Sequence, residues 1–174
     1  AGAPLDIVTR YEKWSGANDG RWHQPLKLFV ILAGKEALRE GSISIRNVVV
    51  MPTPPKIDIQ TTVRLDEIGE TDTGNWEYNN GNEFQGAQGG LVAIDALNEL
   101  RGLALSADFS QGGRYVGTRK RFQLSGVTAT QMVRLKLRSE TVSRFSLRLV
   151  DETGQCHQRG DMKLTPDGQW HQLE

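Results

Sequence analysis

Two stretches of alternating apolar and polar residues constrain this chain more than any other feature. The first covers residues 131–138 and the second covers residues 144–151, with the polar segment Ser139-Glu140-Thr141 after the first. A period of two is typical of a β-strand with one buried face. Two such runs joined by a short polar segment predict an antiparallel hairpin. The residues expected on the buried side are Val133, Leu135, Leu137, Phe145, Leu147 and Leu149.

The whole chain, residues 1–174, predicts a single all-β domain. Its length fits one domain, and it contains 19 glycines, frequent turn signals and little helical periodicity. Nine or ten short strands separated by turns predict an antiparallel β-sandwich of the jelly-roll type. Further core positions expected from the strand pattern are Leu28, Val30, Ile45, Val48, Leu105, Phe122, Leu124 and Trp170.

The polar side of the alternating runs is rich in cations. Seven basic residues share one strand parity, and we expect them to form a single patch on one sheet face: Arg119, Arg121, Arg134, Lys136, Arg138, Arg144 and Arg148. The chain as a whole has 21 basic and 21 acidic residues. Its balanced charge argues against nucleic acid or an anionic membrane as a partner, and no apolar run reaches the ~18 residues that span a bilayer.

No group of residues predicts an enzyme, and we expect no catalytic residue. Glu83 and Asp108 could be an acid pair of the kind that glycosidases use, but acids on sandwich loops more often cap turns. The three histidines are scattered without a metal-ligand spacing. Cys156 and His157 are neighbours in a predicted strand, so they point to opposite faces and do not form a dyad.

Four segments carry a resemblance to known proteins. Residues 76–87 read WEYNNGNEFQGA, residues 108–116 read DFSQGGRYV, residues 151–158 read DETGQCHQ, and residues 167–171 read DGQWH. Together they resemble the jelly-roll, carbohydrate-binding-like modules that are attached to bacterial glycoside hydrolases. The resemblance implies a secreted or periplasmic protein that binds a polysaccharide or oligosaccharide without catalysis.

The order of the segments departs from that family. Residues 1–51 resemble the C-terminal third of such a module, residues 52–56 form a proline-rich connector, and residues 57–174 resemble the N-terminal two thirds. Two interpretations remain: a circular permutation, which predicts a monomer, or a boundary between tandem modules, which predicts a strand-exchanged dimer. The chain begins at Ala1, so we expect a removed leader or a longer parent protein.

The same resemblance implies a structural calcium ion. The first strand of the module supplies acids that could bind Ca²⁺, here Asp66, Glu67 and Glu70. The last strand, however, has Arg46-Asn47 where paired aspartates are common. A cation is unfavourable beside Ca²⁺, so the alternative is that these acids belong to a solvated loop.

Candidate ligand-binding residues are aromatic, basic and amide side chains that could stack on sugar rings or bind hydroxyls. In or beside loops these are Trp22, Trp76, Arg114, Tyr115, His157 and Gln158, and on the basic patch they are Arg134, Lys136 and Arg148. The patch is either a solvated surface or a groove for an acidic or sulfated polysaccharide with Tyr115 as its stacking platform. The alternative function is a structural spacer or assembly module without ligand affinity.

Overall fold

The computed structural model describes residues 25–34, 40–52, 63–65, 68, 72–95, 101–123 and 131–173. Within these ranges every regular element is a β-strand, which confirms the all-β prediction. The strands are β1 (Pro25–Ala33), β2 (Glu40–Pro52), β3 (Val63–Arg64), β4 (Glu77–Asn79), β5 (Gln88–Ile94), β6 (Gly102–Asp108), β7 (Tyr115–Arg121), β8 (Gln131–Arg138), β9 (Arg144–Asp151), β10 (Cys156–Lys163) and β11 (His171–Leu173). No described segment is a helix that could cross a membrane.

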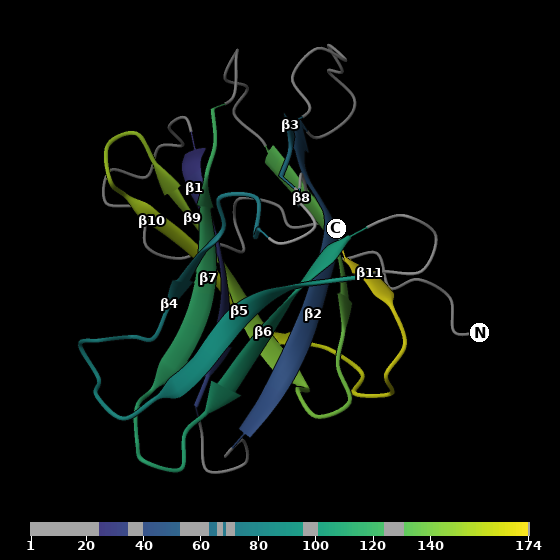
Figure 1. Ribbon diagram of the computed structural model, residues 1–174. Coiled ribbons are helices and arrows are strands. Elements are labelled where there is room, and N and C mark those ends of the chain that lie inside the picture. The colour runs from purple at the N-terminus through teal and green to yellow at the C-terminus, as the bar shows by residue number, and fades with distance from the viewer. Residues whose placement is uncertain are drawn as a thin grey trace.

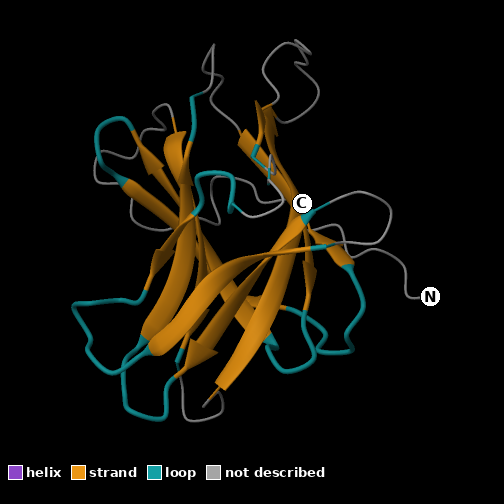
Figure 2. Ribbon diagram, viewed as in Figure 1, coloured by secondary structure: helices purple, strands orange, loops and turns teal. Residues whose placement is uncertain are grey.

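The strands form two antiparallel sheets that pack face to face, as Figures 1 and 2 show. The five-stranded sheet has the order β10-β9-β1-β7-β4. The six-stranded sheet has the order β11-β8-β2-β6-β5, and β3 pairs with β2 outside this path. Consecutive strands such as β1 and β2, or β6 and β7, lie in different sheets. The predicted antiparallel β-sandwich is therefore confirmed, with the sheet-to-sheet connections that a jelly roll uses.

The first two strands occupy central positions in the two sheets. β1 lies between β9 and β7, and β2 lies between β8 and β6. β1 and β2 therefore connect the remaining strands of both sheets within one chain. The permutation itself, and the boundaries at residues 51, 52 and 56, stay predictions.

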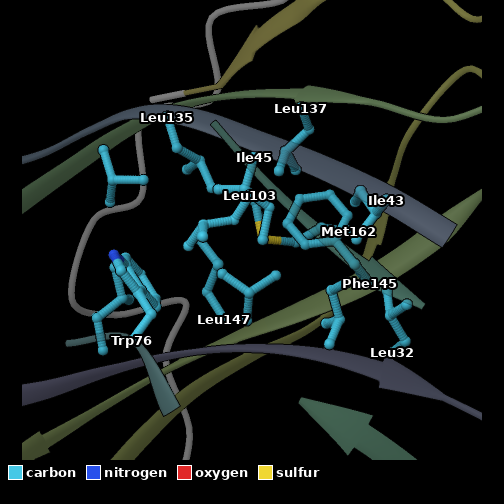
Figure 3. Packing of buried hydrophobic residues seen from close by; sticks show 14 of the residues in the cluster. Leu32, Ile43, Ile45, Trp76, Leu103, Leu135, Leu137, Phe145, Leu147 and Met162 are labelled. Carbon is cyan, nitrogen blue, oxygen red and sulfur yellow. The ribbon is translucent and has the colours of Figure 1, made fainter. Parts of the chain in front are cut away.

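The space between the sheets is filled by the apolar side chains that the alternation places inward (Figure 3). Phe145 and Leu147 of the five-stranded sheet are at most 1% exposed, as are Leu135 and Leu137 of the six-stranded sheet. Leu124 lies outside the described residues. The other predicted core positions, Leu28, Val30, Ile45, Val48, Leu105, Phe122, Val133 and Leu149, are also buried, except Trp170.

The predicted hairpin between the two alternating runs is wrong. β8 belongs to the six-stranded sheet and β9 to the five-stranded sheet, so the connection between them crosses the edge of the sandwich. Ser139 holds this crossing: its hydroxyl donates to the carbonyl oxygen of Ser42 at 2.6 Å and accepts from the amide of Val142 at 2.8 Å. Val142 is fully buried and closes this part of the core.

The crossing also divides the predicted basic patch. Three of its cations project from the outer face of the six-stranded sheet, namely Arg134, Lys136 and Arg138. The other four project from the outer face of the five-stranded sheet, namely Arg119, Arg121, Arg144 and Arg148. The prediction of one patch of seven cations is therefore wrong, because the two groups face opposite sides of the molecule.

Candidate functional site

A row of side chains crosses the outer face of the five-stranded sheet. The strand register places one residue from each of the five strands in line: Gln158, Arg148, Phe29, Arg119 and Glu77. We call these five residues the outer row. Phe29 lies at the centre of the row and is partly exposed. On each side of Phe29 the row continues with an arginine and then with a polar residue.

Both arginines of the outer row are held by their neighbours. Arg148 donates from Nε and Nη2 to Oε1 of Gln158 at 2.9 and 2.7 Å. Arg119 donates from Nε to Oε2 of Glu77 at 2.7 Å. These bonds orient the two guanidinium groups on the surface, so each arginine loses little conformational freedom when a ligand binds.

Tyr115 and Glu83 lie beside this row. Tyr115 begins β7, and its hydroxyl donates a hydrogen bond to Oε1 of Glu83 in the β4–β5 connection. The connection approaches Tyr115 closely because Gly81 has a φ of +63° and no side chain. A Cβ at Gly81 would lie 2.7 Å from the carbonyl oxygen of Tyr115 and 3.3 Å from its ring. A larger residue there would displace the loop that carries Glu83.

The charges of this group are coupled. Burial first, then the hydrogen bond to Glu83 and the charge of Glu83, raise the pKa of Tyr115 to about 12, while Arg148 acts in the opposite direction. The hydrogen bond from Tyr115 is the main cause that lowers the pKa of Glu83, and the positive charge of Arg148 contributes. At neutral pH the group therefore contains an ionised Glu83, a neutral Tyr115 and a cationic Arg148.

Phe84 and Arg114 extend the aromatic part of the site. The guanidinium carbon of Arg114 lies 4.4 Å from the centre of the Phe84 ring. Phe84 in turn meets Tyr115 edge to face, with ring centres 6.3 Å apart and planes at 71°. Four predicted binding residues, Arg114, Tyr115, Arg148 and Gln158, thus lie on one side of the sandwich.

A hollow lies farther along the same strands. Its volume is about 410 Å³, and the described residues that line it are Lys27, Arg121, Phe122 and Gln123. Lys27 and Arg121 are register partners on β1 and β7, two positions along from Phe29 and Arg119. The site thus extends from Tyr115 at the start of β7 toward an open hollow at the end of that strand.

Two of the predicted binding residues, Trp76 and His157, are buried. Trp76 is 3% exposed and donates from Nε1 to the carbonyl oxygen of Leu65 at 2.8 Å, so its ring is part of the core. His157 is 1% exposed, with Nε2 3.3 Å from Oδ2 of Asp151. Neither side chain offers a surface to a ligand.

The remaining predicted residues lie elsewhere. Arg134 and Lys136 project from the opposite sheet, so they are not part of this site. Trp22 and the three acids of the calcium prediction, Asp66, Glu67 and Glu70, lie outside the described residues. Among the residues that the structure describes, no group of three or more metal-ligating side chains is found. The calcium ion stays a prediction.

Sequence reasoning missed Phe29 and the role of Glu83. Phe29 lies in the nearly continuous apolar run 26–32, where strand parity cannot be read from the residues. The sequence suggests Glu83 only as a catalytic acid paired with Asp108, but Asp108 lies in the other sheet and accepts from the amide of Ser110 at 2.7 Å. The glycines around Glu83 were the available signal, because they allow its loop to reach Tyr115.

Comparison with known proteins gives no match: no family model, no curated protein and no solved structure is similar to this chain. The resemblance to carbohydrate-binding-like modules therefore stays a prediction from the residues.

Proposed function

We propose that this protein is a non-catalytic carbohydrate-binding module whose ligand lies on the outer face of the five-stranded sheet. The observation that carries the proposal is the outer row, in which a partly exposed aromatic ring lies between two arginines held by polar partners. Sugars present apolar C–H faces edged by hydroxyl groups. An aromatic centre flanked by fixed polar groups matches that chemistry.

The site contains both hydrogen-bond donors and hydrogen-bond acceptors for sugar hydroxyls. Arg119 and Arg148 are donors with several N–H groups, and the bonds to Glu77 and Gln158 use only part of this capacity. The carboxylates of Glu77 and Glu83 are acceptors. A sugar hydroxyl both donates and accepts, so it can bridge one group of each kind. In this proposal the module is appended to a glycoside hydrolase in a secreted or periplasmic protein, as the resemblance implies.

A glycan array followed by calorimetry tests the proposal. We expect the wild-type protein to bind at least one oligosaccharide, and Arg148→Gln to weaken that binding by about tenfold or more, because a hydrogen bond to a charged group contributes about 1.5–3 kcal/mol. Binding should not change between about pH 6 and pH 9, since Glu83 stays ionised and the pKa of Tyr115 is about 12.

Arg144→Gln is the matched control. Arg144 also projects outward from β9, but it lies four residues from Arg148, outside the outer row. Its replacement should leave the affinity within about twofold, as expected for an exposed side chain outside the site. Equal losses in both variants, or no binding to any glycan on the array, would favour the alternative of a structural spacer.

A further inference from the structure

The outer face of the six-stranded sheet carries a second cluster, built around Trp170. The guanidinium carbon of Arg46 lies 4.0 Å from the centre of the Trp170 ring, and that of Arg138 lies 5.2 Å from it. Trp170 is partly exposed, so its predicted place in the core is wrong. The register explains this: His171 pairs with Leu137, which points inward, and Trp170 therefore shares the outward parity of Arg138. We call Arg46, Lys136, Arg138 and Trp170 the Trp170 cluster.

A β-bulge brings Arg46 to this position. The register between β2 and β8 shifts between Arg46 and Val49, and Asn47 has a φ of +51°. Asparagine tolerates this left-handed conformation better than most residues, and bulges commonly redirect a neighbouring side chain. Gly102 on β6 lets the two strands approach closely at this point, because a Cβ there would lie 2.8 Å from the carbonyl oxygen of Ile45. The local backbone thus directs Arg46 onto the tryptophan.

The Trp170 cluster concentrates positive charge. Lys136 is the register partner of Arg46, and Arg138 is two residues farther along β8. In the described part of the chain, none of these three cations forms an ion pair with a carboxylate. The nearby carboxylate of Asp167 instead accepts from Nε2 of His171 at 2.8 Å. Mutual repulsion among the three cations is therefore not offset by a carboxylate of the described residues.

Arg46 also has an unused donor. Its Nε is buried without a hydrogen-bond partner among the described residues. Burial, and second the charge of Arg138, lower the pKa of Arg46. Arginine nevertheless stays protonated, so the cost of burying its charge next to Arg138 would be reduced by an anion bound between them.

We propose that the Trp170 cluster binds the sulfate or carboxylate groups of an anionic polysaccharide. Contact with Trp170 restricts the guanidinium groups of Arg46 and Arg138, and their terminal N–H groups can bind an oxyanion with charge-assisted hydrogen bonds. Lys136 adds a third positive charge beside them. Three cations this close together can bind one or two anionic groups of a sugar chain. Nucleic acid instead presents a continuous series of phosphates, which would need a longer basic surface. This site is separate from the outer row and does not depend on it.

Calorimetry with sulfated and neutral oligosaccharides of equal length tests the proposal. The probes are a heparin hexasaccharide, an oligogalacturonate, maltohexaose and single-stranded oligothymidine. We expect one of the two anionic sugars to bind, with an affinity that decreases as salt screens the charges. The double variant Arg46→Gln/Arg138→Gln should weaken that binding by about tenfold or more, since charge-assisted hydrogen bonds are lost.

The matched control removes the same charge from the opposite side. Arg144→Gln/Lys163→Gln changes two exposed cations of the five-stranded sheet, register partners on β9 and β10 that belong to neither proposed site, and it should leave the affinity within about twofold. Lys136→Gln, a single change at a cation that does not contact the Trp170 ring, gives a second readout if the double variant unfolds, and it should also weaken binding.

Equal losses in the two double variants, equal affinity for oligothymidine, or no preference for the anionic sugars would overturn the proposal. Loss of outer-row binding through Arg148→Gln would leave this site intact, so the two proposals can fail independently.

Discussion

Replacing Leu135 with alanine should lower the free energy of unfolding by about 2–5 kcal/mol, because the change removes buried methyl groups and leaves a cavity between the sheets. Leu135 is fully buried on β8 and lies in the core cluster with Leu147 from the opposite sheet. Packing from both sides limits how far the surroundings can collapse into the space. Urea denaturation of the wild type and the variant, with the slope compared as well as the midpoint, measures the effect.

Lys136→Ala is the natural control for this experiment. Lys136 is the next residue on β8 and projects outward, so its replacement should change the free energy of unfolding by about 0.5 kcal/mol or less. If Leu135→Ala cost no more than Lys136→Ala, the inward register of β8 would be wrong. A changed slope would indicate that the variant has lost two-state unfolding.

Strand alternation was sufficient to predict the buried face of each strand but not its sheet. In a sandwich, β8 and β9 bury the same residues whether they pair as a hairpin or face each other across the core. The apolar residue Val142, in the segment that joins them, was the signal that the connection is not an ordinary polar turn. It is fully buried, because the chain passes over the edge of the core at this point.

Part of the candidate site was also within reach of the sequence. The strand and loop positions of Arg148 and Gln158 indicate them as candidates, but nothing in the sequence shows that they are register partners. Trp170 was misplaced because the Asp167-Gly168-Gln169 turn leaves its parity open until His171 is paired with Leu137. Strand pairing over long sequence separations therefore decides which polar residues meet, and this information is not contained in local periodicity.

The turn between β9 and β10 is built on a buried carboxylate. Oδ1 of Asp151 accepts hydrogen bonds from the amide and hydroxyl of Thr153 at 3.0 and 2.7 Å, and from the amide of Gln155 at 2.9 Å. Burial would raise the pKa of Asp151, but the hydrogen bonds from Thr153, His157 and Gln155 outweigh it, so the pKa lies below its ordinary value. The ionised form is therefore the one that the fold stabilises.

Asp151→Asn should lower the free energy of unfolding by about 3 kcal/mol at pH 7, because it removes a buried charge on which several donors converge.

A carboxyl group whose pKa is depressed by folding contributes stability that is fully present above its unfolded pKa of about 3.9 and is lost as the pH falls through the folded pKa. The asparagine cannot titrate. The difference between wild type and variant should therefore shrink as the pH is lowered below about 4. Glu152→Gln, at the exposed neighbouring position, serves as the control and should change stability by about 0.5 kcal/mol or less. A difference for Asp151→Asn that did not vary with pH would mean that packing of the turn, and not the charge of Asp151, is what stabilises it.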